Sequence, residues 1–331
     1  MDQHENTGIT RRSFLAVTAG LTSLAGIALP RGTCAAGTRG YTTIIDLSLC
    51  DGCRDRQLPA CVAACRDINL ARMPEPVNPI PVPYPRRIIE DWSQKKDVTD
   101  RLTPYNLIFV EKAEVTWKGQ RRTLFIPRRC MHCDNPACAT ICPFSANHKY
   151  EDGAVVINRH LCLGGAKCRT VCPWSIPQRQ SGVGIYLHLL PTLAGNGVLF
   201  KCDLCHDLLA RGETPGCIAA CPRGALLIGE RDQIYQEARR RAAAMDGYIY
   251  GERENGGTAT LYVSPVPFEK LNEVIPKGPG LPHLGPATRR MEETDLAGKF
   301  ALIGAPLIGI IAGLAGALVP RADGRDKRKG E

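Results

Sequence analysis

The chain has 331 residues, enough for two domains of ordinary size, and a formal net charge of +9. It has 16 cysteines, whereas Phe, Trp and Tyr make up only 6% of the residues, so we expect cysteine chemistry to organise the interior as much as aromatic packing does. It has no Gly-rich dinucleotide fingerprint, P-loop or nucleophile elbow, and nothing else in it resembles a substrate site. These absences disfavour nucleotide-binding enzymes and serine hydrolases.

The amino terminus has the layout of an export signal. Arg11 and Arg12 precede a mildly apolar, uncharged stretch that runs to Pro30, and small residues follow at Ala35 and Ala36. A basic pair, an apolar segment and a small-residue cleavage site are typical of a twin-arginine signal, which we predict over residues 1–36. The alternative is a membrane anchor that happens to follow two arginines.

Two contrasting segments come next. Residues 41–49 are rich in β-branched and apolar side chains and predict a short strand. Residues 68–103 include six prolines between positions 74 and 85, which exclude a helix or a central strand and predict an extended surface segment. A plain linker and an arm that docks a partner fit this segment equally well.

The remaining elements are short. Residues 107–115 and 122–126 alternate in polarity and predict a hairpin that turns at Lys118 and Gly119. Asp232 can cap a helix over residues 233–245, which has one apolar side. Further strands are predicted at residues 154–157, 225–228 and 258–263.

Fifteen of the cysteines fall into four similar motifs, and Cys34 is the only one outside them. Each motif ends with two cysteines separated by three residues, and in three motifs a proline follows directly. The third motif has Gly165 where its second cysteine would stand. In chain order the motifs are Cys50, Cys53, Cys61 and Cys65; Cys130, Cys133, Cys138 and Cys142; Cys162, Cys168 and Cys172; and Cys202, Cys205, Cys217 and Cys221.

This pattern is close to the C-x2-C-x2-C-x3-C-P run of bacterial ferredoxins, in which three thiolates hold one iron–sulfur cluster and the fourth ligates a second cluster. We therefore predict an α+β fold with two ferredoxin-like two-cluster units that carry loop insertions, over residues 41–229. Clusters held by thiolates are negatively charged, so they account for much of the excess Lys and Arg. For this reason we predict no nucleic-acid partner.

The spacing does not say which motifs share their clusters. If the middle motifs pair, Cys130, Cys133, Cys138 and Cys172 hold one cluster, and Cys162, Cys168 and Cys142 hold another. If the outer motifs pair, Cys50, Cys53, Cys61 and Cys221 hold a third cluster, and Cys202, Cys205, Cys217 and Cys65 hold the fourth.

Gly165 leaves one iron corner without a thiolate ligand. We expect three [4Fe–4S] clusters and one [3Fe–4S] cluster at this gap, the alternative being a fourth [4Fe–4S] cluster with a ligand other than cysteine. His160 and Lys167 are close in the sequence, but neither occupies the missing position. Fewer thiolates ease reduction, so this cluster is expected to have a higher potential than its neighbours.

Disulfides and structural zinc are the competing explanations for so many cysteines. Disulfides suit exported proteins, but twin-arginine export would carry a protein already folded around its clusters. Zinc sites do not require the C-x3-C-P ending. We expect His132 and His206 to shield or hydrogen-bond a cluster rather than ligate one. Four basic residues either offset cluster charge or are simply solvated: Arg128, Arg129, Lys201 and Arg223.

The carboxyl terminus predicts a membrane anchor. Residues 300–319 carry no charge and are long enough to cross a bilayer. The basic tail at 320–331 favours the cytoplasmic side, which places the cluster domain outside. Residues 276–286 are rich in Pro and Gly and predict a stalk before the anchor. A buried helix of a soluble protein is the alternative for residues 300–319.

Four further stretches complete a family resemblance: Cys61-Val-Ala-Ala-Cys65-Arg-Asp-Ile-Asn, Lys201-Cys-Asp-Leu-Cys205, Pro215-Gly-Cys217-Ile-Ala-Ala-Cys221-Pro and Gly251-Glu-Arg-Glu-Asn-Gly-Gly-Thr. With them the chain resembles the four-cluster ferredoxin subunits of membrane-bound bacterial oxidoreductases, especially the periplasm-facing subunit of quinone-linked nickel–iron hydrogenases. The resemblance implies that middle motifs pair together and outer motifs pair together. It also implies a catalytic or cytochrome redox partner and a multi-helix, quinone-binding membrane partner.

The function expected from all of this is electron transfer without catalysis by this chain, at the periplasmic face of the inner membrane. A stand-alone, membrane-tethered cluster-binding sensor or structural protein is the alternative. The expected domains are a signal peptide (1–36), a four-cluster domain (37–230), an extension with stalk (231–299), the anchor (300–319) and a cytoplasmic tail (320–331).

Overall fold

The computed structural model describes residues 40–84, 87–192, 196–289 and 291. The predicted signal peptide, anchor helix and basic tail lie outside these residues. Within the described ranges, no helix is both long enough and apolar enough to cross a membrane.

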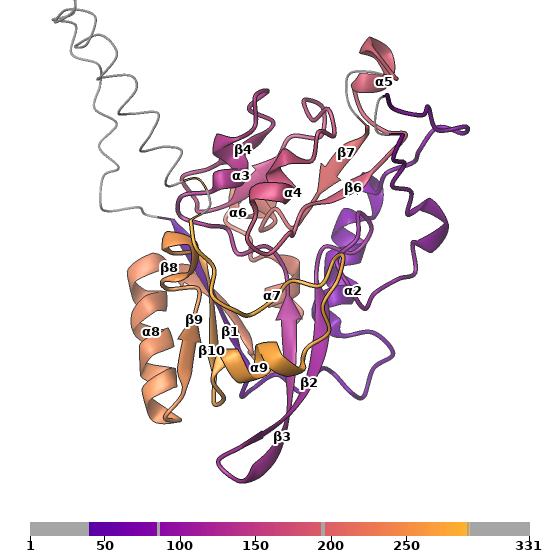
Figure 1. Ribbon diagram of the computed structural model, residues 1–331. Helices are drawn as coiled ribbons and strands as arrows, with labels where there is room; N and C mark the ends of the chain where they lie inside the picture. The colour runs from indigo at the N-terminus through magenta and orange to yellow at the C-terminus, as the bar shows by residue number, and fades with distance from the viewer. Residues whose placement is uncertain (1–39, 85–86, 193–195, 290, 292–331) are drawn as a thin grey trace, which may run out of the picture. The chain divides into compact units, whose positions relative to one another are not determined.

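The largest sheet joins segments from both ends of the described chain. Its strands are ordered β8 (Leu226–Glu230), β1 (Tyr41–Asp46), β10 (Thr260–Ser264) and β9 (Tyr248–Tyr250). β1 runs antiparallel to β8 and parallel to β10, as Figure 1 shows. Because β1 precedes the first cysteine motif and β8 follows the fourth, this sheet brings the outer motifs together.

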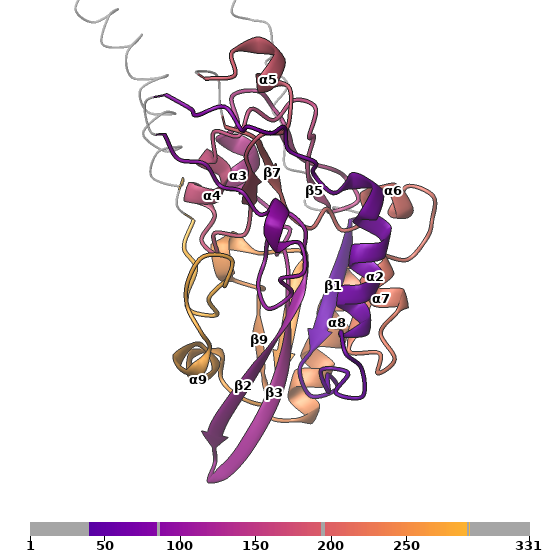
Figure 2. The ribbon, with the colours of Figure 1, turned by 90° about the vertical axis from the view of Figure 1, so that its right-hand side faces the viewer.

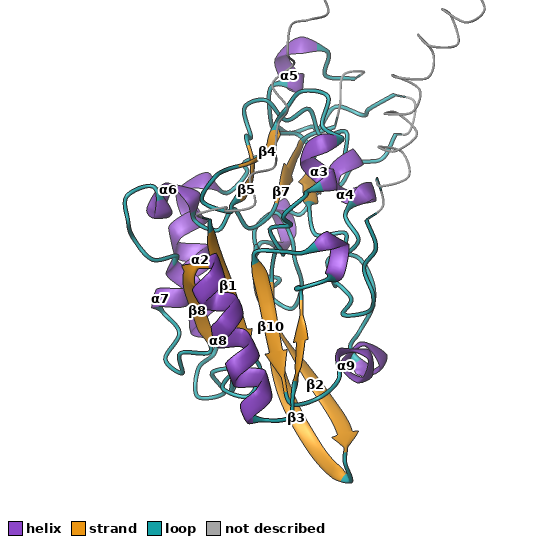
Figure 3. Cartoon of the chain, turned by 90° about the vertical axis from the view of Figure 1, so that its left-hand side faces the viewer, coloured by secondary structure: helices purple, strands orange, loops and turns teal. Residues whose placement is uncertain are grey.

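One face of this sheet is covered by α8 (Arg231–Ala244), which lies along β8, β1 and β10 in Figure 3. Ile234 and Ala238 of α8 pack against Ile44 and Leu261 in a small apolar cluster. The helix begins at Arg231, so Asp232 lies inside its first turn, and no side chain caps it. The predicted cap is therefore wrong, although the predicted helix is present.

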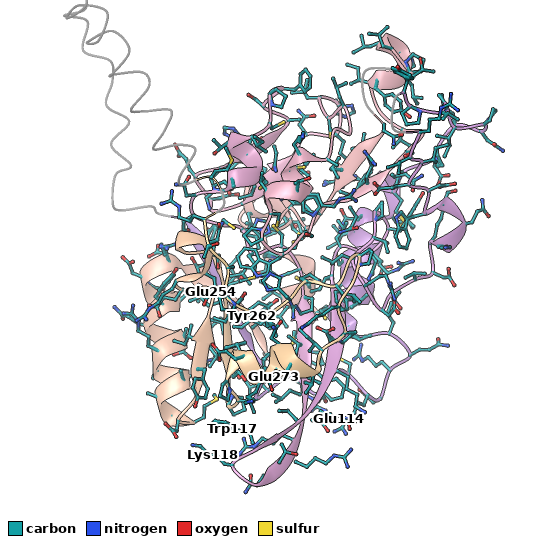
Figure 4. All side chains as sticks on the ribbon, viewed as in Figure 1. Glu114, Trp117, Lys118, Glu254, Tyr262 and Glu273 are labelled. Carbon is teal, nitrogen blue, oxygen red and sulfur yellow. The ribbon has the colours of Figure 1, made fainter. Side chains whose placement is uncertain are left out.

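The predicted hairpin is present as β2 (Phe109–Trp117) and β3 (Gln120–Arg128), with the turn at Lys118 and Gly119. Both turn residues have positive φ angles, of 49° and 75°, as two-residue hairpins prefer. Figure 4 labels Trp117 and Lys118 at the tip. At its other end β3 leads directly into the second cysteine motif.

The middle motifs lie among short elements, of which only β5 matches a predicted strand, the one at residues 154–157. Two antiparallel strand pairs form here, and each strand has three residues. They are β4 (Asn147–Lys149) with β5 (Val155–Ile157), and β6 (Gln178–Gln180) with β7 (Val198–Phe200). The helices not yet mentioned are α2 (Ala60–Asn69), α3 (Ala137–Thr140), α4 (Lys167–Val171), α5 (Tyr186–Leu189), α6 (His206–Leu209), α7 (Gly216–Ala219) and α9 (Phe268–Val274).

In its described residues the proline-rich segment is irregular, as predicted, apart from the end of α2 at residues 68–69 and two 3-10 turns at 70–72 and 93–95. It is nevertheless held closely against the third motif and β6. Glu90 receives hydrogen bonds of 2.6 and 2.8 Å from Arg169 on α4, and its carbonyl accepts the Ser181 N–H at 2.8 Å. The segment therefore buttresses the region around Gly165, which a plain linker would not do.

The predicted stalk at 276–286 is also attached to the body of the domain. Arg128 donates hydrogen bonds to the carbonyls of Pro282 and His283 at 2.6 and 2.9 Å, and Tyr250 donates one to the carbonyl of Gly285 at 2.7 Å. Leu284 is buried. These residues are not a free stalk, because their backbone carbonyls are bound by buried side chains.

The buried pair of Glu111 and Arg128 predicts a pH dependence of stability. Burial raises the pKa of Glu111 to about 7 from its usual 4.5, even though Arg128 lies 3.4 Å away. The folded state therefore retains a proton that the unfolded state releases, so this carboxyl favours folding below pH 4.5 and loses that contribution as the pH rises through 7.

We expect the free energy of unfolding of the wild type to fall, relative to that of Glu111→Gln, by on the order of 2 kcal/mol between pH 5 and pH 8. Anaerobic denaturant titrations of both cluster-loaded proteins would measure this. Parallel pH profiles for the two would contradict the assignment.

Candidate iron–sulfur cluster sites

The first and fourth cysteine motifs form two neighbouring cavities. α2 carries Cys61 and Cys65 and packs against α7, which carries Cys217 (Figure 2). In each cavity, three thiols come from one motif and the fourth comes from the other. One cavity is lined by Cys50, Cys53, Cys61 and Cys221, and the other by Cys65, Cys202, Cys205 and Cys217.

The second and third motifs meet in the same way through α3 and α4, which pack side by side in Figure 2. Burial and then the charges of Cys172, Cys130 and Cys138 raise the pKa of Cys133, which places these four thiols together. Burial and the charge of Cys142 contribute in the same way to the raised pKa of Cys162. Burial and then the charges of Cys138, Cys162 and Cys142 raise the pKa of Cys168 to about 12. The structure thus brings together the thiols of both middle motifs, as pairing of these motifs requires.

The chemistry of these donors fits an iron–sulfur cluster. Burial raises the pKa of Cys202 to about 11 and that of Cys205 to about 12, so both thiols remain protonated at neutral pH unless a metal displaces the proton. All fifteen described cysteines are free, which gives no support to disulfides.

Gly165 faces solvent at the gap in the third motif. A Cβ atom built there would meet no heavy atom within 4 Å, and the backbone is not in the left-handed region. His160 and Lys167 are both exposed. The corner is therefore open, and the space that a cysteine side chain would need is free.

The two histidines of the ligand loops differ. His132 is completely buried, and its Nδ1 accepts the N–H of Val155 at 2.9 Å, so the neutral ring carries its proton on Nε2. Burial, followed by the charges of Lys201 and Arg129, lowers its pKa. Among the described residues Nε2 has no hydrogen-bond partner, which leaves a buried donor for a cluster sulfur. His206 instead lies 2.6 Å from Asp152, so its expected role at a cluster finds no support.

The four basic residues also separate into two kinds. Arg128 is paired with Glu111, and the exposed Arg223 is paired with Asp51 at 2.7 Å. Arg129 and Lys201 are buried beside thiols. The only hint in the sequence is that each of these two directly precedes the first cysteine of a motif.

Asn69 is a site residue that the sequence did not indicate. It is buried in the last turn of α2 and lines one cavity together with Cys65. Its Nδ2 donates to the Cys65 carbonyl at 2.8 Å and lies 3.7 Å from the Cys65 sulfur. Its position one turn after Cys65 is the signal that could have found it.

Comparison with known families agrees with this geometry. Two models described as a 4Fe-4S dicluster domain match residues 49–146 and residues 121–231, and each match contains cysteines from two or more motifs. The chain belongs to the 4Fe-4S dicluster family. The predicted family resemblance is thereby confirmed, and this dicluster protein is expected to hold several [4Fe–4S] clusters.

The curated relatives of this 4Fe-4S dicluster protein include the hydrogenase-2 operon protein HybA of Escherichia coli O157:H7. The two are 31% identical over 269 residues, or 71% of this chain and 72% of HybA. The probable anaerobic dimethyl sulfoxide reductase chain YnfG of Escherichia coli K12 is 31% identical over 210 residues, 62% of this chain and 81% of YnfG. The iron–sulfur subunit of the nitrate-inducible formate dehydrogenase of that strain is 27% identical over 230 residues, 66% of either chain.

Proposed function

We propose that this chain is an electron-transfer subunit that passes electrons through four clusters, between a periplasmic redox partner and a quinone-reactive membrane subunit. The observation that carries the proposal is the interleaving of thiols on α2. Cys61 and Cys65 lie on adjacent turns of this helix, yet they line different cavities. Two clusters held there would be close neighbours, which suits stepwise transfer of single electrons.

The proposed ligands are the fifteen cysteines of the four motifs, which would hold three [4Fe–4S] clusters and one [3Fe–4S] cluster, the last at Gly165. Bound clusters would supply one-electron exchange, at potentials set by the cluster type, its hydrogen bonds and its burial. The chain itself contributes the thiolates, the buried shell that keeps water from them, and hydrogen-bond donors such as His132 and Asn69. Because nothing here resembles a substrate site, we assign it no catalysis of its own.

The partners and the location are proposed from the sequence and from the names of the relatives. Those names include a hydrogenase operon protein, a dimethyl sulfoxide reductase chain and a formate dehydrogenase subunit. We therefore propose a hydrogenase, a molybdenum enzyme or a multihaem cytochrome as the periplasmic partner. The signal at 1–36 and the anchor at 300–319 would place the chain on the periplasmic face of the inner membrane, with its tail in the cytoplasm.

Purification of the full-length chain from detergent-solubilised membranes, under anaerobic conditions, tests this proposal. We expect a multi-helix membrane protein and a redox subunit to copurify, and a quinone analogue to reoxidise the reduced clusters in the complex. The chain without partners would instead support the stand-alone sensor or structural protein. Turnover of a substrate by the isolated chain would overturn the electron-transfer assignment.

A further inference from the structure

Arg129 is a completely buried cation with an unusual set of neighbours. It lines the cavity of Cys65, Cys202, Cys205 and Cys217, and its Nη1 lies 3.8 Å from the Cys202 sulfur. Its Nη2 donates to the Thr43 hydroxyl at 2.5 Å. Within the described chain it forms no ion pair with a carboxylate, and its Nε has no hydrogen-bond partner. The groups beside it that can become anionic are the thiols of this cavity, which carry charge once a cluster displaces their protons.

Lys201 lies in the same part of the interior. Its Nζ donates to the carbonyls of Val155 and Cys202, and it too forms no carboxylate ion pair in the described ranges. The thiols that act on its charge are Cys130 and Cys138 of the second motif and Cys202 of the fourth. The charge of Lys201 therefore interacts with thiols of two different cluster sites, one from each pair of motifs.

Other charged groups nearby are already engaged. Asp203 pairs with Arg72 at 3.4 Å, and Lys149 donates to the carbonyls of Cys133 and Gly153 at 3.0 Å. A buried charge without a counter-ion is strongly destabilising. Anionic groups in the adjacent sites, as thiolate-bound clusters would supply, would offset the charges of Arg129 and Lys201.

We infer that Arg129 and Lys201 form a cationic seam that raises the reduction potentials of the two clusters beside it, those of Cys65/Cys202/Cys205/Cys217 and Cys130/Cys133/Cys138/Cys172. Each reduction adds one electron, and hence one negative charge, to a cluster. Fixed positive charge in a low-dielectric interior stabilises that added charge more than it would in water. The seam would thus hold electrons where the two pairs of motifs meet. This inference rests on the proposed cluster ligands.

Redox titration of the isolated, cluster-loaded chain, monitored by EPR, tests the seam. Lys201→Met is expected to lower both potentials, and Arg129→Met mainly that of the Cys65 cluster. We expect at least a tenfold fall in the equilibrium constant for reduction, which for a one-electron couple is about 59 mV. Lys201→Arg and Arg129→Lys keep the charge and should stay close to the wild type. Arg240→Gln removes an exposed arginine that pairs with Glu237 on α8, away from the thiol-lined cavities, and should leave every potential in place.

Unchanged potentials in loaded Lys201→Met and Arg129→Met proteins would overturn the inference. Equal shifts in the charge-conserving variants would also overturn it, since they would indicate a packing effect. If the methionine variants fail to load iron, Arg129→Gln and Lys201→Gln provide the same comparison while keeping a hydrogen-bond donor. The measurement needs no partner subunit, so its outcome is independent of whether the membrane complex is found.

Discussion

Replacing Gly165 with cysteine is expected to convert the cluster of the third motif from three irons to four. The near-isotropic EPR signal of an oxidised [3Fe–4S] centre should disappear, and the iron content should rise by one per chain. The added thiolate places more negative charge around the centre, so its reduction potential should also fall. EPR of anaerobically purified protein, with iron and sulfide analysis of the same sample, would measure all three changes.

The local geometry makes this a well-defined substitution. Residue 165 has the spacing of the missing ligand, its backbone can accept an L side chain, and a Cβ there contacts nothing within 4 Å. The preceding glycine is different: Gly164 has a φ of +72°, and a Cβ there would lie 2.5 Å from the Gly197 carbonyl oxygen. Cysteine at 164 is therefore expected to disturb the loop without supplying the ligand.

Gly165→Ala is the matched control, because it adds the same Cβ atom without a thiol. It should keep the three-iron signal and the wild-type iron content. Wild-type protein with iron for four complete cubanes, and without the isotropic signal, would show that another ligand fills the corner. The expectation of a higher potential at this cluster would then lose its basis.

The cysteine motifs, the hairpin turn and α8 could be predicted because their signals are local. Lys118 and Gly119 stand between two alternating segments, and the apolar side of α8 repeats at helical spacing. The parallel pairing of Thr43 with Thr260 could not be predicted in this way, since it depends on contacts between distant parts of the chain. As a result, strands from the predicted extension complete the sheet that carries the outer motifs.

The same limit applies to the cluster sites. Spacing identified the fifteen cysteines but left their pairing open, and only the family resemblance indicated it. Spacing also could not distinguish the role of Arg129 from that of Arg128, because the two residues are adjacent in the sequence. Both are buried in the structure. Arg128 finds Glu111 on the neighbouring strand, whereas Arg129 points into a cavity of thiols. Which partner a buried charge meets depends on tertiary structure.

Serine substitutions on α2 are expected to remove two different clusters, although the substituted cysteines lie on adjacent turns of one helix. Cys65→Ser should abolish the same EPR signal as Cys202→Ser, because both thiols line one cavity. Cys61→Ser should abolish the same signal as Cys221→Ser, in the other cavity. Serine offers a harder ligand than thiolate, so each variant should lose or degrade one cluster and retain the other three.

Ala63→Ser, on the same helix between the two cysteines, should keep all the signals and serves as the control for serine in α2. In the assembled complex, each cysteine variant should slow electron transfer to a quinone analogue at least tenfold, because one step of a linear path is missing. If Cys61→Ser and Cys65→Ser removed the same signal, each motif would hold a cluster of its own. The interleaved arrangement on α2, and with it the short path between clusters, would then have to be abandoned.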